Sequence, residues 1–509
     1  MKMPLSACSS IVKSYFVLLF LFIMCSCDKF GISNSKKSSE HTSVLSKNKK
    51  NQEFFSSSNS LLGVHLNNEY LKQIPSNFLP FLVVKSDQEQ QASSFLESRG
   101  ILNQEKYICI ADKSNNERET YQNILECVSK FRSQFNKSDI FKHVVNAATD
   151  DYVLIGAKLR THLQLASELQ ETFVSRFVDK YIMKNVLLKN DKTIKTADYL
   201  KISNIFGSAL ELRQNLEQAI TDTFGSSWST LVVKPSKSSA SRGVFIVSND
   251  DNFTDKLENI SKEIFSDKSV ASVIVEEFIE GRVLRMDGYV KNGSLGANFT
   301  SSYHIPPKDF YHLGDPQLTI LKSENEDRKR YDQFTQQVAY ALEFRNGPFH
   351  LEAIESTSGE LYFLEISIRP GGTLASTLSH IGFNPRRSFV LQQLGLEYEA
   401  HLKEDPTFGV IAVHPPFWSK NSEFYIDLIE YKPLDHFSSY MDDFSYIPRE
   451  AGMQVSRFNR FIEVAFIGDS NLDAEADARE FFNSLKIHLK SIDHDEEVVL
   501  DKGKWSPAS

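Results

Sequence analysis

Two acidic residues, Glu352 and Glu365, lie in a segment whose pattern predicts a β-hairpin. Residues 349–354 and 361–369 alternate between apolar and polar side chains, and residues 356–360 supply a turn that contains Gly359. If Glu352 lies opposite Glu365, both glutamates share one polar face of the hairpin. The polar face then carries His350, Glu352, Glu365, Ser367 and Arg369, and the apolar face carries Phe349, Leu351, Ala353, Leu364, Ile366 and Ile368.

Two opposed carboxylates on a hairpin indicate a cation site. Directly opposed residues have Cβ atoms about 5 Å apart, and like charges at that distance repel each other. Hard carboxylate oxygens suit Mg²⁺, with phosphate and water completing the shell. Arg369 is followed by Pro370-Gly371-Gly372, where the glycines let the backbone approach a ligand and the arginine can bind phosphate. A solvated outer face of a sheet is the alternative that the alternation alone leaves open.

Basic residues and a loop of small residues could bind phosphates. Lys234 ends an expected strand over residues 229–234, and the loop over residues 236–243 can surround phosphates with N–H and hydroxyl groups. A serine-rich surface turn is the alternative for this loop. Lys180 and Lys184 lie four residues apart on an expected helix, a spacing that also fits a solvated stripe. A Walker A sequence is absent, which argues against a P-loop fold.

The elements that must position these residues alternate between strands and helices. Strands are expected at residues 81–84, 107–110 and 143–145, with helices at residues 88–99 and 118–135 between them. This order predicts a parallel sheet with crossover helices. Further expected elements are helical segments within residues 151–190, strands at residues 244–247 and 272–277, a helix at residues 326–344, strand-like pieces within residues 410–488 and a closing helix at residues 474–485.

The composition is that of a globular protein and excludes several classes. The chain has 509 residues, 41% of them hydrophobic, and a net charge of -9. We expect no nucleic-acid partner, because such proteins need a clustered basic face. Five cysteines make a disulfide framework unexpected, and Cys109 and Cys127 are interpreted as packed thiols. The charged tail after residue 493 is expected to be loose.

The first residues have the pattern of a secretory signal. Lys2 and Lys13 precede the apolar residues 15–24, and small residues lead to Cys27, as in a bacterial lipoprotein segment. Cys27 is therefore a lipidation candidate and a membrane anchor. Residues 28–60 are rich in Ser, Asn and Lys, which is typical of a flexible tether. A start of the true chain further downstream is the alternative.

Taken in order, these segments resemble the ATP-grasp superfamily, and within it the carboxylate–amine ligases, which include bacterial L-amino-acid (dipeptide) ligases. The segments that carry the resemblance span about residues 78–488. They are Asp179-Lys180-x-x-Met183-Lys184, Val232-Val233-Lys234-Pro235 with its loop, Val275-Glu276-Glu277-Phe278-Ile279-Glu280-Gly281, Met286-Asp287-Gly288, Gly347-Pro348-Phe349-His350-Leu351-Glu352 and Glu365-x-Ser367-x-Arg369-x-Gly371-Gly372.

The resemblance implies a role for each of these positions. Glu352 and Glu365 match metal ligands, with Ser367 at the position of an Asn ligand. Arg369 matches the arginine that stabilises the transferring phosphoryl group, and Arg285 lies where this branch often has a substrate-facing basic residue, although a surface arginine fits equally. The ATP-binding positions implied are Lys180, Lys184, Lys234, Ser238, Ser239, Ala240, Ser241, Gly243, Glu276, Glu277, Phe278 and Ile279.

The resemblance implies an α/β (α+β) ATP-grasp fold with an N-terminal parallel-sheet domain and two α+β subdomains that clamp ATP. The expected parts are a signal or lipoprotein segment (1–27), a flexible linker (28–60), the N-terminal α/β domain (61–165), the small lid subdomain with the phosphate loop (166–280), the large subdomain with the metal site (281–400), a C-terminal α+β part (401–495) and a tail (496–509).

The implied activity is an ATP- and Mg²⁺-dependent ligation, with Mn²⁺ as an alternative metal, that joins an amino-acid-like carboxylate to an amine through an acyl phosphate. Val283, Ser367 and the glycine-poor loop depart from the family pattern. They keep open a nucleotide-binding module or pseudoenzyme without turnover. A phosphotransferase or carboxylase-type member and a homodimer also stay open. The location stays open as well, because a lipoprotein segment indicates export whereas ATP dependence favours the cytoplasm.

Overall fold

The computed structural model describes residues 59–509 with short gaps. The gaps are residues 115, 204–207, 240, 251, 268–269, 306–316, 322–325, 373, 404–406, 414, 416–422, 443–444, 449–450, 457–460, 469–470, 493–494 and 508–509. The signal-type segment with Cys27 and nearly all of the linker lie outside the described residues. Within the described part, no helix combines the length and the apolar character needed to cross a bilayer.

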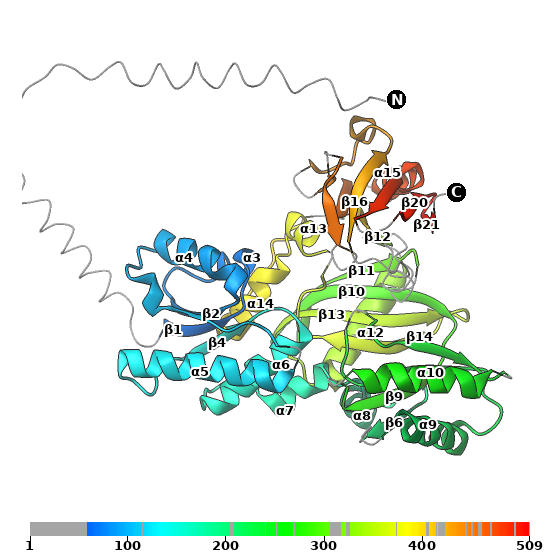
Figure 1. Cartoon of the computed structure of the whole chain (residues 1–509), viewed down its shortest axis with the longest axis horizontal. Helices are drawn as coiled ribbons and strands as arrows, with labels where there is room; N and C mark the ends of the chain where they lie inside the picture. The colour runs from blue at the N-terminus through cyan, green and yellow to red at the C-terminus, as the bar shows by residue number, and fades with distance from the viewer. Residues whose placement is uncertain are drawn as a thin grey trace, which may run out of the picture. The chain divides into compact units, whose positions relative to one another are not determined.

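The N-terminal part is a parallel sheet, as expected, and it has four strands in the order β3-β2-β1-β4. Its strands are β1 (Ser60–Val64), β2 (Leu79–Val84), β3 (Ile108–Ile110) and β4 (His143–Asn146). Its helices are α3 (Asn68–Leu71), α4 (Glu89–Ser98), α5 (Glu117–Phe135) and α6 (Asp150–His162). Figure 1 shows α3 and α4 on one side of this sheet and α5 and α6 on the other. Both faces of the strands are buried for this reason.

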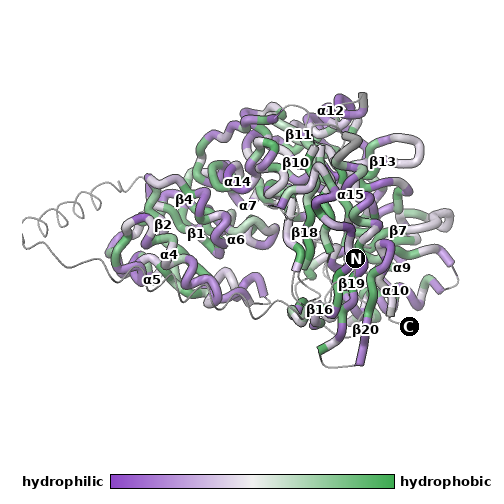
Figure 2. Tube along the Cα trace, turned by 90° about the horizontal axis from the view of Figure 1, so that it is seen from above, coloured by the Kyte–Doolittle hydropathy of each residue, from purple (hydrophilic) through white to green (hydrophobic). Residues whose placement is uncertain are grey.

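Alternate residues of the strands pack against opposite helix layers. Leu62 and Phe81 lie in the core formed with α5 and α6, whereas Leu61 and Leu82 lie in the core formed with α4. In Figure 2 the tube of α5 alternates between hydrophobic and hydrophilic stretches, which is the pattern of a helix with one buried face. Strand β1 was not expected, because Ser60 ends the Ser-rich segment and residues 61–64 carry no alternating pattern of their own.

The interpretation of Cys109 and Cys127 as separate packed thiols is wrong. The two cysteines form a disulfide that joins β3 to α5 across 18 residues of sequence. Both residues are buried in the core between the sheet and this helix. Their apolar surroundings were therefore predicted correctly, but the covalent bond between them was not.

The segment expected to form the lid subdomain contains an antiparallel sheet, called the lid sheet below, with the strand order β6-β9-β7-β8. Its elements are β6 (Tyr199–Ser203), α9 (Ala209–Phe224), β7 (Thr230–Pro235), β8 (Phe245–Ser248), α10 (Phe253–Ser266) and β9 (Ser272–Glu277). The apolar faces of α9 and α10 pack on the sheet through a core of their own. Before this sheet come α7 (Glu171–Val174) and α8 (Lys180–Asn190), which carries the two predicted lysines.

An eight-stranded sheet forms the centre of the large subdomain, with the order β18-β15-β12-β11-β10-β13-β14-β5. Its strands are β5 (Lys195–Thr196), β10 (Gly281–Lys291), β11 (Ser294–Tyr303), β12 (Gln317–Leu321), β13 (Gly347–Ser356), β14 (Leu361–Ser367), β15 (Thr407–Val413) and β18 (Ile462–Gly468). The associated helices are α12 (Glu326–Ala341), α13 (Ala375–His380) and α14 (Pro385–Gln393). The apolar core under β10, β13 and β14 includes residues of α8 and α12.

The C-terminal sheet has the order β17-β16-β19-β20-β21 and packs with α15. Its elements are β16 (Glu423–Glu430), β17 (Gln454–Ser456), α15 (Asn471–Ser484), β19 (Lys486–Ser491), β20 (Glu497–Asp501) and β21 (Lys504–Pro507). The expectation of a loose tail after residue 493 is wrong, since β20 and β21 extend this sheet. Val498 and Leu500 lie in the core on one face of β20, whereas Glu497, Val499 and Asp501 lie on the other face, a period of two that the overall charge of the segment concealed.

The disulfide gives a first testable prediction. Replacing both Cys109 and Cys127 by Ser should lower the free energy of unfolding of the N-terminal part by about 3 kcal/mol, because a closed loop of this length restricts the unfolded chain. Thermal melting with and without reductant measures the loss, and reductant should not affect the double variant. Free alkylation of both thiols in denatured, unreduced protein would contradict the bond.

Candidate functional site

The hairpin forms with the register that the sequence predicts. Glu352 on β13 is paired with Glu365 on β14. The next pair along the strands is Ala353 with Phe363, so Leu364 is an extra residue that forms a β-bulge. The expectation that Leu364 belongs to the apolar face is therefore wrong, and Phe363 lies in the core in its place. The bulge lies directly before Glu365, the predicted metal ligand. It therefore shifts by one residue which side chains of β14 point to each face of the sheet.

Strand β10 extends the polar face of the hairpin. Arg285 on β10 is paired with Glu352, and Asp287 on the same strand is paired with His350. His350 is in turn paired with Ser367 on β14. Two parallel rows of polar residues therefore cross three neighbouring strands, with Arg285, Glu352 and Glu365 in one row and Asp287, His350 and Ser367 in the other.

Lys180 connects Glu365 to the phosphate loop. Its Nζ lies 3.2 Å from Oε2 of Glu365 and donates a hydrogen bond of 2.5 Å to the backbone oxygen of Ser238. The backbone N–H of Lys180 also donates to the oxygen of Ser236 at 2.9 Å. Burial alone would lower the pKa of Lys180, but the charges of Glu365 and Asp150 outweigh burial and raise it. Lys180 therefore stays charged at the point where the loop meets the hairpin.

Glu352 is stabilised as a carboxylate by neighbours other than Lys180. The hydroxyl of Tyr303 donates to its Oε1 at 2.9 Å, and Nε2 of His350 lies 3.5 Å from the same oxygen. Burial tends to raise the pKa of Glu352, but the hydrogen bond and charge of His350 lower it overall. The carboxylate is consequently available as a metal ligand without a change of protonation. The sequence analysis did not single out Tyr303, which ends β11 beyond any recognised motif.

Arg285 is buried and not a surface residue, since it is 1% exposed. Its Nε and Nη2 donate to the two carboxylate oxygens of Asp287 at 2.5 and 3.3 Å. Nδ1 of His350 lies 3.1 Å from Oδ1 of Asp287. A side chain at Gly371 would come within 2.3 Å of Nη2 of Arg285 and 2.6 Å of Oδ1 of Asp287. Gly371 therefore lets the backbone cover this charged cluster, and contact between Arg285 and a substrate stays a prediction.

Arg369 is held by a residue of the N-terminal part that the sequence analysis missed. Its Nε and Nη2 donate to the two carboxylate oxygens of Asp150 at 2.8 and 2.7 Å, and the hydroxyl of Ser367 donates to Asp150 at 3.1 Å. Burial tends to raise the pKa of Asp150, but the charge of Arg369 keeps it below its usual range. Metal ligation by Ser367 stays a prediction. The only signal for Asp150 was its place in the first turn of a helix after a buried strand.

Lys184 and Lys234 bind Glu276 in a buried ion cluster. Lys184 is 0% exposed and Glu276 is 2% exposed, so a solvated stripe on this helix is excluded. The Nζ atoms of Lys184 and Lys234 lie 3.0 and 2.6 Å from the two carboxylate oxygens of Glu276. Burial would raise the pKa of Glu276, but the two lysine charges outweigh it and lower the pKa to about 2. The cluster joins α8 to two strands of the lid sheet.

The remaining predicted ATP-binding positions lie in two loops of the lid. Ser238 donates its hydroxyl to the oxygen of Arg242, and Gly243 has a positive φ of 67°. Ser239 and Ser241 lie in the same loop, whereas Ala240 lies outside the described residues. At the end of β9, the N–H groups of Glu277 and Phe278 donate to the oxygens of Asp198 and Thr230. The N–H of Ile279 makes no hydrogen bond to any described residue, so a ligand can use it.

The carboxylates fit a hard divalent cation. No group of three or more His, Cys, Asp or Glu side chains is placed to hold a metal in the described part of the chain. If they held a cation, Glu352 and Glu365 would offer two oxygen ligands and leave the other positions to phosphate oxygens and water, the kind of shell that Mg²⁺ takes in phosphoryl-transfer sites. The opposed carboxylates match this donor set.

Comparisons with known proteins identify the central part of the chain. Residues 228–378 match a family model described as "ATP-grasp domain". This part of the chain is therefore an ATP-grasp domain. The matched residues include β7, the loop after it, β9 and the whole Glu352–Glu365 hairpin.

Two curated relatives are ligases. The chain is 26% identical over 245 residues to an L-arginine-specific L-amino acid ligase of Bacillus subtilis, in an alignment that covers 48% of this chain and 55% of the relative. It is 30% identical over 154 residues to a D-alanine–D-alanine ligase of Petrotoga mobilis, covering 29% of this chain and 49% of the relative. The chain spans about half the length of these relatives.

Solved structures show that the ATP-grasp fold extends beyond the matched domain. An L-amino acid ligase from Bacillus licheniformis superposes with a TM-score of 0.57 at 16% identity, over 84% of this chain and 98% of that chain. A biotin carboxylase–beta-gamma-ATP complex from Campylobacter jejuni gives 0.56 at 10% identity, over 84% and 92%. The expected fold class is therefore confirmed.

The buried ion cluster gives a second prediction. Replacing Glu276 by Gln leaves Lys184 and Lys234 buried without a carboxylate, which should lower the stability of the chain by about 3–5 kcal/mol. The neighbouring, exposed Glu277 is the matched control, and Glu277→Gln should change stability by less than about 0.5 kcal/mol. Thermal melting of both variants tests the difference, and equal midpoints would contradict the assigned role of the cluster.

Proposed function

We propose that this chain is an ATP- and Mg²⁺-dependent ligase that joins the carboxylate of one amino-acid-like substrate to the amine of another. The observation that carries the proposal is the position of Lys180. It contacts both Glu365 of the metal hairpin and the backbone of Ser238 in the phosphate loop. A triphosphate between the loop and the hairpin would meet a lysine, two carboxylates suited to Mg²⁺ and Arg369 within one site.

Different residues of the site would bind the phosphates and the adenine of the nucleotide. Lys180 and the loop over residues 236–243 bind the phosphates, while the buried Glu276 fixes the start of the segment that receives the adenine. The free N–H of Ile279 supports this role, because it can donate to a ring nitrogen of the base. Mg²⁺, when bound at Glu352 and Glu365, neutralises phosphate charge and orients the phosphates.

The proposed reaction has two steps. An oxygen of the substrate carboxylate attacks the γ-phosphorus, the bond to the bridging oxygen breaks, and an acyl phosphate and ADP result. The amine then attacks the acyl carbon, a C–N bond forms, phosphate leaves and the nitrogen loses a proton. Such phosphoryl transfer depends mainly on positioning and on charge stabilisation. Arg369, which Asp150 holds, would stabilise the transferring group.

Amino acids as substrates are part of the proposal. The name of the Bacillus subtilis relative, an L-arginine-specific L-amino acid ligase, supports this class. The pairing of Arg285 with Asp287 and of Asp287 with His350 supplies both charge signs next to the metal hairpin. Both signs are needed to recognise a substrate that carries an ammonium and a carboxylate group.

Loss of one metal ligand gives a third prediction. Glu365→Ala should lower ADP formation by about 10²–10³-fold, which is the usual loss when one charge-stabilising group is removed. Circular dichroism should show an unchanged fold. Glu360→Ala, on the exposed turn of the same hairpin, is the matched control and should keep full turnover.

The measurement is ADP release with mixed L-amino acids, compared with a reaction without amino acids, and mass spectrometry of the product. An amide product supports the ligase, whereas a phosphorylated or carboxylated product points to another member of the superfamily. No ADP from the wild-type protein would favour a binding module. Equal ADP formation by wild type and Glu365→Ala would reject the metal site.

The salt bridge to Arg369 gives a fourth prediction. Asp150→Asn keeps a hydrogen-bond acceptor but removes the charge that orients the guanidinium group. We expect kcat to fall by at least about tenfold with a smaller change in the KM for ATP, because Arg369 acts on the transferring group. Asp151→Asn, on the next and partly exposed residue, is the control. Unchanged kcat in Asp150→Asn would show that Arg369 needs no such support.

A further inference from the structure

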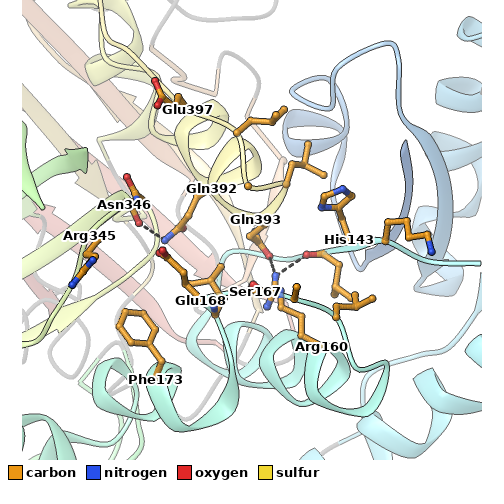
Figure 3. A pocket seen from close by; sticks show the side chains of 18 of the residues that line it. His143, Arg160, Ser167, Glu168, Phe173, Arg345, Asn346, Gln392, Gln393 and Glu397 are labelled. Atoms are coloured by element: carbon orange, nitrogen blue, oxygen red, sulfur yellow. Dashed lines mark hydrogen bonds between the residues drawn. The ribbon is translucent and has the colours of Figure 1, made fainter. Parts of the chain in front are cut away.

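A cavity of about 400 Å³ lies away from the candidate active site, between the N-terminal sheet and the end of α14. Strand β4 begins at this cavity with His143 and ends at Asn146, shortly before Asp150. The cavity and the contact between Asp150 and Arg369 therefore lie at opposite ends of the same strand. Figure 3 shows the side chains that surround the cavity, among them Arg160, Glu168 and Gln393. Its volume is within the range of about 300–1,000 Å³ that small-molecule sites occupy.

Arg160 is the unusual residue of this cavity. It is 2% exposed, and its Nη2 donates to the oxygen of Val144 at 2.6 Å, to Oε1 of Gln393 at 2.7 Å and to Oδ1 of Asn146 at 3.4 Å. All three acceptors are neutral and all three share one nitrogen. Nε and Nη1 make no hydrogen bond to the described residues.

The charge of Arg160 is not balanced by a carboxylate of the described chain. Burial alone lowers the pKa of its guanidinium group to about 9, and no neighbouring acid opposes this effect. The other deeply buried cations differ, because Lys184 is paired with Glu276 and Arg285 with Asp287. An unpaired buried charge is costly, so an anion that enters the cavity would be strongly favoured.

The other charges around the cavity limit the kind of anion. Lys142 and Arg345 add positive charge, and Glu168 and Glu397 add negative charge, so with Arg160 the lining has a formal charge of about one positive unit. Lys142 is paired with Asp139, and Glu397 with Lys291. Glu168 has no ion pair with any residue that the structure describes.

The lining thus offers one buried guanidinium group and one unpaired carboxylate, which suit the two ends of a zwitterion. The remaining wall includes Phe173, Phe344 and Leu169, which can contact an apolar side chain. Figure 3 shows Phe173 on the helix next to the segment that carries Glu168. A phosphate dianion would find a single buried cation and an opposing carboxylate, which disfavours it relative to a monocarboxylate.

We propose that this cavity is a second binding site, for a small amino acid with an apolar side chain. Its carboxylate accepts hydrogen bonds from Arg160, and its ammonium group faces Glu168. The site goes beyond the proposed ligase reaction, because it lies at the other end of β4 and includes none of the residues assigned to ATP, metal or catalysis.

Hydrogen–deuterium exchange of the full chain with L-leucine as the probe locates the site without any turnover. We expect slower exchange in residues 163–173 and 392–397, which line the cavity. Isoamylamine, which has the same side chain and amine without the carboxylate, and inorganic phosphate should leave these segments unchanged. Protection by isoamylamine or phosphate equal to that by L-leucine would overturn the proposal, and so would protection confined to α8 and β14.

Variants test the two charged groups by calorimetry with L-leucine. Arg160→Gln should weaken binding by at least about tenfold, because a charged hydrogen bond is lost. Glu168→Gln should weaken binding about threefold. Glu168 is exposed, so this substitution should leave the fold intact. Glu97→Gln on α4 is the matched surface control. If Arg160→Gln does not fold, the affinity of Glu168→Gln for L-leucine tests the site by itself. An unchanged affinity in Glu168→Gln would reject the assigned orientation of the ligand.

Discussion

The repulsion between two opposed carboxylates is the constraint on which the candidate site depends. Glu352 and Glu365 are paired across β13 and β14, where side chains of like charge destabilise a sheet. Each is stabilised by different neighbours, Glu365 by Lys180 and Glu352 by Tyr303 and His350. These neighbours come from α8, β11 and β13. Each of these elements must therefore present a polar side chain to the hairpin, because the two carboxylates need partners there.

The same principle recurs around the hairpin, because buried charges there occur in pairs. Asp287 is bound to Arg285, Asp150 to Arg369, and Glu276 to two lysines. Buried ion pairs seldom increase stability relative to apolar packing, since both partners lose their hydration. Their concentration around one face of the central sheet therefore indicates function, as perturbed titratable groups commonly do. Arg160 departs from this rule, which is why its cavity stands out.

The sequence predicted the parts of the site that depend on local pattern. Alternation along the hairpin predicted the pairing of Glu352 with Glu365, but the bulge at Leu364 was missed because it interrupts that alternation by one residue. Asp150 could not be assigned, since its partner Arg369 lies 219 residues away and only the tertiary fold brings them together. The pairing of Cys109 with Cys127 was missed for the same reason, because an apolar pattern predicts burial and not the contact between two sulfur atoms.

The bond between Asp150 and Arg369 limits how far the parts of this chain can be treated as interchangeable modules. Asp150 begins α6, a helix that packs on the N-terminal sheet, whereas Arg369 directly follows the hairpin that carries Glu352 and Glu365. A chimaera that replaced the N-terminal sheet with that of a relative would retain the hairpin, the loop and every lysine. It would nevertheless lose the anchor of the arginine unless the donor supplied an acidic residue in the first turn of the equivalent helix. Exchange of the lid alone would leave this anchor in place.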